Sequence, residues 1–160
     1  YAPGMAFKFF VPPHHGYSRL PSFLLAPFAQ PSFVGLIVSI ITIISCAAVV
    51  QRKPATVAGA LSLFVGSGVL AHWVATRVFD DRGAARVSST AARLSWVVAT
   101  ALREPTIEFN VYGVRLTAPW ACLLQVALAV GENGGPSAGV LSAHAIGLGL
   151  GAAYGMWLEH

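Results

Sequence analysis

Residues 32–50 read SFVGLIVSIITIISCAAVV, an uncharged and mostly aliphatic run that ends at the polar stretch Gln51-Arg52-Lys53-Pro54. Because a helix rises about 1.5 Å per residue, a run of this length just suffices to cross a bilayer core of about 30 Å. Four further segments with few charges follow it along the chain. The sequence therefore predicts an all-α membrane protein, a polytopic bundle of about five transmembrane helices near residues 32–50, 55–79, 85–102, 116–131 and 136–158.

The composition supports this prediction. Of the 160 residues, 56% are hydrophobic and 10% are charged, whereas roughly a quarter are charged in a typical soluble domain. A water-facing surface cannot be built from so few charges, which excludes an ordinary soluble enzyme. The formal net charge is +4, but the basic residues are spread over every connection, so we expect no nucleic acid partner.

Residues 1–31 differ from the rest of the chain because they are rich in proline and aromatic residues. Proline interrupts helices, so no long helix is expected there. We predict an extramembrane arm that lies on the membrane surface or on partner subunits, followed by a single transmembrane domain over residues 32–160. His14 and His15 stand in a proline-flanked loop of this arm and are expected to be exposed. The chain begins at Tyr1 and not at Met, from which we hypothesise that a targeting peptide is removed.

Cysteines and ionisable side chains also occur within the predicted spans. Cys46 and Cys122 have no CxxC motif and no histidine at metal-ligand spacing, so we expect small buried core residues and no metal site. Arg93 lies on the third segment, which is the least hydrophobic of the five. Facing lipid would be costly, so Arg93 is expected to point into the protein, towards a partner or towards an aqueous cavity. His72, on the second span, is likewise expected to be buried or to contact a partner.

The connection between the third and fourth segments has a different period. Apolar and polar residues alternate from 107 to 111, which is a strand-like or interfacial pattern and not a helical one. Pro105 ends the preceding helix. We therefore expect this connection to lie along the membrane surface.

Glycines recur every four residues on the fifth span, at Gly147, Gly151 and Gly155. They face one direction, so another helix is expected to approach them closely. The expected partner is the third segment, whose small residues recur at intervals of three and four: Ser88, Ala91, Ala92 and Ser95. His144 lies one turn before Gly147, and a serine on the packed helix would give a Ser–His dyad, which can supply a nucleophile and a base.

These motifs together resemble the C-terminal half of the rhomboid superfamily, which consists of membrane proteases and inactive relatives such as derlins. The resemblance covers roughly residues 55–158 and rests on a serine helix, a strand-like connection, an Ala-Pro-Trp entry to the next span, and HAIGLGLG at 144–151. It implies that His144 stands at the position of the catalytic histidine. It also implies that Gly147 and Gly151 are the glycines that let this helix pack against the serine helix.

The serine side of the family pattern is degraded. Proteases of the family hold their nucleophile in GxSG, but if Ser89 is the matching serine, Val87 and Thr90 replace the two glycines. Branched side chains there would crowd the site. The family's HxxxN on an earlier span is also missing, since asparagine occurs only at Asn110 and Asn133. The resemblance therefore implies a catalytically inactive pseudoprotease.

From these observations we predict a non-catalytic, rhomboid-like membrane protein that acts as a small structural or accessory subunit of a larger membrane complex. Its expected partners are membrane lipids and other subunits, with no cofactor and no small-molecule substrate. By analogy with other small membrane subunits, we favour a respiratory complex or the ATP synthase of the mitochondrial inner membrane, with the plastid thylakoid and the endoplasmic reticulum as alternatives.

Two other functions stay open. An intramembrane serine protease would use Ser89, or Ser88, as the nucleophile and His144 as the base. A cofactor-binding antenna or redox subunit would use His72 and His144 as axial ligands of a tetrapyrrole.

Overall fold

The computed structural model describes residues 24–28, 33–50, 55–79, 84–111, 114–132 and 135–157. Most of the arm, including His14 and His15, lies outside the described residues. The described part is mostly helical, and the five predicted segments are confirmed as helices whose ends fall within about two residues of the predicted ones. These helices are α3 (Phe33–Val50), α4 (Ala55–Arg77), α5 (Ala84–Arg103), α6 (Ala118–Glu132) and α7 (Ala138–Trp157). A 3-10 turn, η1 (Ala26–Phe28), precedes them, and a hairpin of β1 (Glu108–Val111) and β2 (Val114–Thr117) joins α5 to α6.

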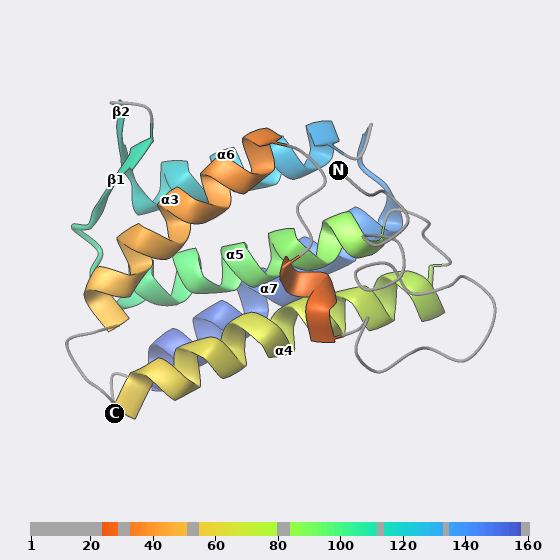
Figure 1. Cartoon of the computed structure of the whole chain (residues 1–160), viewed down its shortest axis with the longest axis horizontal. Coiled ribbons are helices and arrows are strands. Elements are labelled where there is room, and N and C mark those ends of the chain that lie inside the picture. The colour runs from red at the N-terminus through yellow and green to blue at the C-terminus, as the bar shows by residue number, and fades with distance from the viewer. Residues whose placement is uncertain are drawn as a thin grey trace.

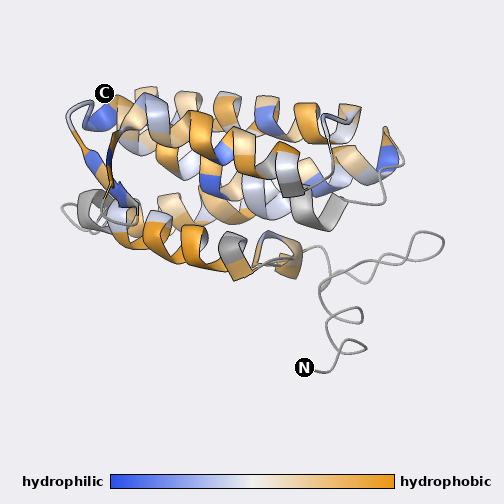
Figure 2. Cartoon of the chain, turned by 90° about the horizontal axis from the view of Figure 1, so that it is seen from above, coloured by the Kyte–Doolittle hydropathy of each residue, from blue (hydrophilic) through white to orange (hydrophobic). Residues whose placement is uncertain are grey.

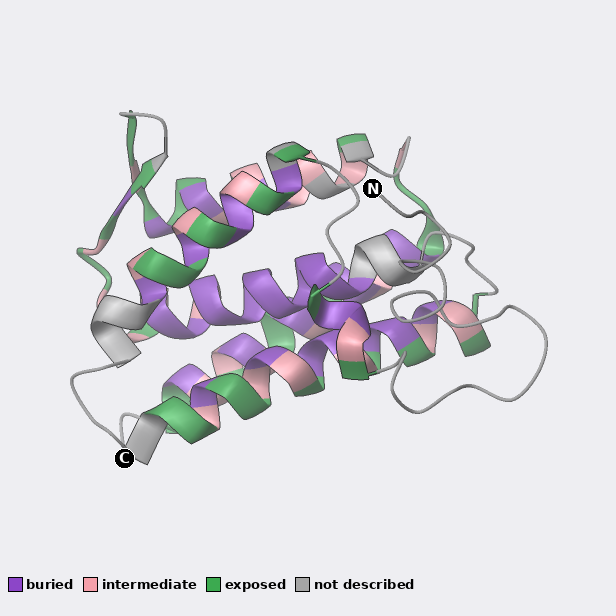
Figure 3. Ribbon diagram, viewed as in Figure 1, coloured by how far each residue is buried: buried purple, intermediate pink, exposed green. Residues whose placement is uncertain are grey.

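Helix α5 forms the centre of the bundle (Figure 1). Helices α4 and α7 lie beside it on one side, and α3 and α6 lie on the other. From residue 88 to residue 100, every side chain of α5 except that of Val98 is buried (Figure 3). The least hydrophobic helix of the chain is therefore the one that is shielded on all sides.

Helices α5 and α7 pack in parallel through the glycine stripe. A Cβ atom added at Gly147 would lie 2.9 Å from the Ala91 carbonyl oxygen, and one at Gly151 would lie 2.5 Å from the Ser95 carbonyl oxygen. Both pairs differ by 56 in residue number, which fixes a parallel register. Since the opposing atoms belong to the backbone, only glycine allows the two helices to lie this close.

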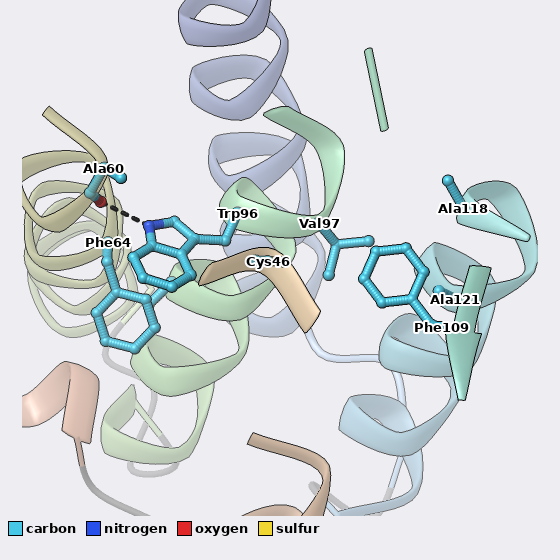
Figure 4. Close-up of a cluster of buried hydrophobic side chains, with 9 residues drawn as sticks. Cys46, Ala60, Phe64, Trp96, Val97, Phe109, Ala118 and Ala121 are labelled. Carbon is cyan, nitrogen blue, oxygen red and sulfur yellow. Dashed lines mark hydrogen bonds between the residues drawn. The ribbon is translucent and has the colours of Figure 1, made fainter. Parts of the chain in front are cut away.

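The hairpin closes one end of the bundle. Its strands pair antiparallel, with Phe109 opposite Leu116. The Phe109 side chain is buried and points towards Val97 of α5 and Ala121 of α6 (Figure 4). The connection is thus anchored to the core through one aromatic ring, and its exposed strands carry an Arg115–Glu108 ion pair of 3.6 Å.

The described end of the arm packs on the chain itself. Ala26 and Pro27 are buried, and a Cβ atom at Gly68 of α4 would lie 2.6 Å from the Pro27 ring. The Phe28 and Phe64 rings lie 5.5 Å apart. The missing side chain at Gly68 leaves room for the proline ring, so this short part of the arm contacts the bundle itself, while the rest of the arm lies outside the described residues.

The outer surface of the bundle is apolar (Figure 2). Large exposed hydrophobic side chains occur on α3, α4, α6 and α7, and twelve polar or charged residues of the described part are buried. Two helical segments, Val57–Arg77 and Ala138–Trp157, are long and apolar enough to cross a membrane. Shorter apolar segments occur at Gly35–Cys46 and Ala118–Leu128.

Two glycines of α7 allow a matched test of the parallel packing. Gly151→Ala places a methyl group against the Ser95 backbone, whereas Gly149 has no atom within 4 Å of an added Cβ. We expect Gly151→Ala to lower the free energy of unfolding by more than about 1 kcal/mol, while Gly149→Ala leaves it unchanged or raises it by up to about 1 kcal/mol through helix propensity. Thermal unfolding in detergent micelles measures both, and equal midpoints for the two variants would contradict the packing.

Candidate functional site

The polar side chains that the sequence singled out gather around α5. We use the term polar core for the buried polar residues of α5, which are Ser88, Ser89, Thr90, Arg93, Ser95 and Thr100. Among the buried polar residues of the neighbouring helices are two histidines, His72 from α4 and His144 from α7. The question is whether these groups form a reactive constellation or a structural network.

Arg93 ties α5 to α3. Its side chain is 1% exposed, and the Nη1 atom donates to the Gly35 carbonyl oxygen and to the Ser39 hydroxyl, both at 3.0 Å. The Nη2 atom donates to the Thr90 hydroxyl oxygen at 3.2 Å, and the Ser39 hydroxyl itself donates to the Gly35 carbonyl at 2.8 Å. One guanidinium therefore holds two helices together through its planar set of donors.

The hydroxyl groups of α5 tie it to α4. Ser88 donates to the Gly68 carbonyl oxygen at 2.8 Å, and the Ser95 and Ser67 hydroxyls lie 2.9 Å apart. Further along, the Trp96 indole donates to the Ala60 carbonyl oxygen (Figure 4). These side chains form a ladder of interhelical hydrogen bonds, which are suited to holding helices together in an apolar surrounding.

His144 lies at the α5–α7 interface, level with Ser88 in the register that the glycines fix. The side chain is 6% exposed. Within the described part of the chain neither ring nitrogen has a hydrogen-bond partner. A serine nucleophile needs its proton within reach of the imidazole. The Ser88 proton is directed to Gly68 instead.

Ser89, the serine that the resemblance matches to the nucleophile, is also buried. His144 makes no hydrogen bond to it among the residues that the structure describes. Thr90, which replaces the second glycine of the family pattern, serves as an acceptor for Arg93. The structure thus places Ser88, Ser89 and Thr90 of α5 close to the level of His144 on α7. Two of these residues, Ser88 and Thr90, take part in structural hydrogen bonds.

His72 is buried in α4, beside the packed cluster of Ala71, Ala91, Val140 and Ala143. No group of three histidine, cysteine or acidic residues that could hold a metal occurs in residues 24–157 outside the gaps named above. Both histidines are buried within the bundle.

A second polar contact, between α3 and α6, was not predicted. Gln125 donates from Nε2 to the Thr42 hydroxyl at 2.9 Å, and Thr42 donates to the Val38 carbonyl at 2.7 Å. Besides Val38, the buried residues of α3 among those whose burial is described are small or weakly polar and recur at intervals of three and four: Gly35, Ser39, Thr42 and Cys46. That spacing within an otherwise aliphatic run is the signal that would have revealed this surface.

The Arg93 network yields a direct prediction. In Arg93→Lys, one ammonium group replaces the two nitrogens that reach α3 and Thr90 from separate positions, so some buried acceptors lose their donor. We expect a loss of about 1–3 kcal/mol in the free energy of unfolding in micelles. Arg103→Lys, at the half-buried end of α5, is the matched control and should change it by less than about 0.5 kcal/mol. Similar losses in both variants would show that the network contributes nothing.

Comparison with known proteins adds no relative. No protein-family model matches the chain, and neither a curated protein nor a solved structure matches it. The function of the chain is therefore inferred from its own residues and their geometry.

Proposed function

We propose that this chain is a non-catalytic, rhomboid-like integral membrane protein that acts as a small structural or accessory subunit of a larger membrane complex. The observation that carries the proposal is the distribution of polarity, with hydroxyl groups and a guanidinium inside and large hydrophobic side chains outside. In water this arrangement would be unfavourable, because the large hydrophobic side chains would be exposed to solvent, whereas lipid provides an apolar solvent for the outer face.

The position of the exposed aromatic residues supports membrane insertion. Phe33 is the first residue of α3, Trp120 is the third of α6, Trp157 is the last of α7, and Trp73 lies near the end of α4. Exposed aliphatic residues such as Ile40, Ile43 and Leu148 lie nearer the middle of the helices. Aromatic residues prefer the two interfaces of a bilayer and aliphatic residues its core.

All five helices belong to the proposed membrane domain. Helix α5 is too polar to face lipid, but its neighbours shield it, so its low hydropathy is compatible with a central position. Helix α6 has 15 residues and is about 22 Å long, which is shorter than a bilayer core of about 30 Å. Local thinning of the bilayer accommodates such a helix at modest cost.

The hydrogen bonds of the polar core favour an inactive protein. Ser88 donates to Gly68, Thr90 accepts from Arg93, and His144 has no partner among the described residues. A displacement of about 1 Å from productive geometry already costs a factor of about 100 in rate. An intramembrane serine protease with a Ser89/His144 dyad remains the alternative, because both residues face the interior of the same bundle.

An accessory role fits the small extramembrane mass of the described part, which is limited to the hairpin and short turns. Partners are then bound through the outer faces of the helices, together with membrane lipids. The mitochondrial inner membrane, with its respiratory complexes and ATP synthase, is the favoured location by analogy, and the thylakoid and endoplasmic reticulum membranes are the alternatives.

The assembly state tests the proposal directly. After mild detergent extraction from its native membrane, we expect the protein to migrate on a native gel with a complex many times its own mass of 16.7 kDa. Harsher detergent should release it as a smaller species, which serves as the control for non-specific aggregation. Migration as a free monomer under the mildest conditions would remove the accessory-subunit function.

Reaction with a fluorophosphonate probe tests the absence of catalysis. Because the Ser88 proton is directed to a backbone carbonyl and His144 makes no hydrogen bond to a described serine, we expect no labelling above that of the heat-denatured protein. Labelling of the native protein that disappears in both Ser89→Ala and His144→Ala would establish the protease alternative instead. Thermal unfolding of both variants shows whether a lost signal reflects lost folding.

A further inference from the structure

The turn η1 lies where three segments of the chain meet. A Cβ atom added at Gly68 of α4 would lie 2.6 Å from the Pro27 ring of η1 and 3.1 Å from the Ser88 carbonyl oxygen of α5. Two groups this close to one point are close to each other, so Pro27 covers the backbone of α5 at Ser88. We use the term Gly68 seat for this contact. Pro27 is fully buried in the seat, whereas Phe28 beside it is 49% exposed.

The Gly68 seat is near the beginning of α5. The turn η1 packs against α4 and α5, on the side of α5 where α3 and α4 diverge (Figure 1). Ser88 lies four residues after Ala84, the first residue of α5, which corresponds to about 6 Å along the helix. Because the proposed function places helix ends at the membrane surface, water outside the bundle is close to the residue that Pro27 covers.

The contact that Pro27 covers is polar. The Ser88 hydroxyl is fully buried and donates to the Gly68 carbonyl oxygen at 2.8 Å. A carbonyl oxygen has two lone pairs, so the Gly68 and Ser88 carbonyls can both accept a hydrogen bond from water when the proline ring is displaced. Lipid offers no such donor and favours the seated ring, whereas water stabilises the uncovered form.

The turn η1 is held differently from the helices around it. Pro27 packs on Gly68, and the Phe28 ring packs on the Phe64 ring at 5.5 Å. Helices α3 and α4 are instead joined to α5 by hydrogen bonds of Arg93 and Ser88. Apolar packing gains little in a membrane, because lipid tails offer equivalent contacts, and a 3-10 turn of three residues has little stability of its own. The turn can therefore leave α5 more easily than α3 or α4 can.

We propose that η1 is a displaceable plug over the serine face of α5. In the closed form Pro27 occupies the Gly68 seat and shields Ser88 from solvent. In the open form η1 has left the seat while the helices stay packed. The rings of Pro27 and Phe28 set the equilibrium between the two forms. The proposed function enters this inference only through the weak hold in lipid and the position of the helix ends.

The reaction rate of a thiol under the plug tests the proposal. In the full chain, Cys46→Ala and Cys122→Ala remove both native thiols, and Ser88→Cys adds one of similar size beside Gly68. The protein in detergent micelles is treated with a water-soluble maleimide, and labelling is followed by mass spectrometry. We expect slow labelling, which Pro27→Ala combined with Phe28→Ala accelerates about tenfold. The thiol reacts only in the open form, and loss of the aromatic pair and the proline ring raises the population of that form.

Two matched variants distinguish release of the plug from general loosening of the bundle. Leu24→Ala removes a side chain that is 48% exposed, much like that of Phe28, and should leave the labelling rate unchanged. Ser95→Cys, in place of Ser88→Cys, puts the thiol at another fully buried serine of α5 that contacts α4, through Ser67. Its labelling rate should not respond to the loss of the two rings.

A change on the α4 side gives a second, independent variant. Gly68→Ala places a methyl group against the Pro27 ring and should also accelerate labelling at position 88, whereas Gly66→Ala, which meets no atom within 4 Å, should not. The proposal is overturned if the thiol at position 88 reacts equally fast with and without the two rings, if Leu24→Ala has the same effect as their loss, or if the thiol at position 95 is accelerated as much. Assembly on a native gel is a separate measurement, so the plug and the proposed function can fail independently.

Discussion

Arg93 places a permanent charge in the centre of the bundle, and the arrangement of the helices follows from the need to shield it. A guanidinium cannot lose its proton in a protein, so its burial requires acceptors on fixed neighbours. The carbonyl of Gly35 and the hydroxyl of Ser39 provide them on α3, and Thr90 does so on α5. Helix α3 is thus attached to the bundle by polar contacts on its inner face while its outer face stays aliphatic.

Shielding the remaining faces of α5 requires close neighbours, and the chain achieves this with two kinds of contact. On the α7 side, Gly147 and Gly151 bring the backbones together with no side chain between them. On the α4 side, hydroxyl groups such as Ser88 bond directly to the neighbouring helix. Since α5 and α7 are parallel, α6, which connects them in the chain, must run in the opposite direction. It lies with α3, on the side of α5 that faces away from α4 and α7 (Figure 1).

Much of this fold could be predicted from the sequence, because hydrophobic runs and the prolines and glycines between them mark helix ends locally. The spacing of Gly147, Gly151 and Gly155 likewise identified the face of α7 that meets another helix. What could not be predicted is which residues far apart in the sequence contact each other. Nothing in the local pattern says that Gly68 accommodates Pro27, and the strand-like period around Phe109 gave no sign that one ring anchors the hairpin.

The same limit applies to the candidate site, where the sequence identified the residues but not their bonds. It placed Ser88, Ser89 and His144 on packed helices and noted Thr90 where the proteases of the family that the sequence resembles have glycine. The geometry adds a physical reason why this difference matters. Position 90 cannot both lack a side chain, as a protease of this pattern requires, and supply a hydroxyl to Arg93. Glycine at this position would remove an acceptor from a buried cation, so within the proposed function the inactive motif and the stability of the bundle depend on the same side chain.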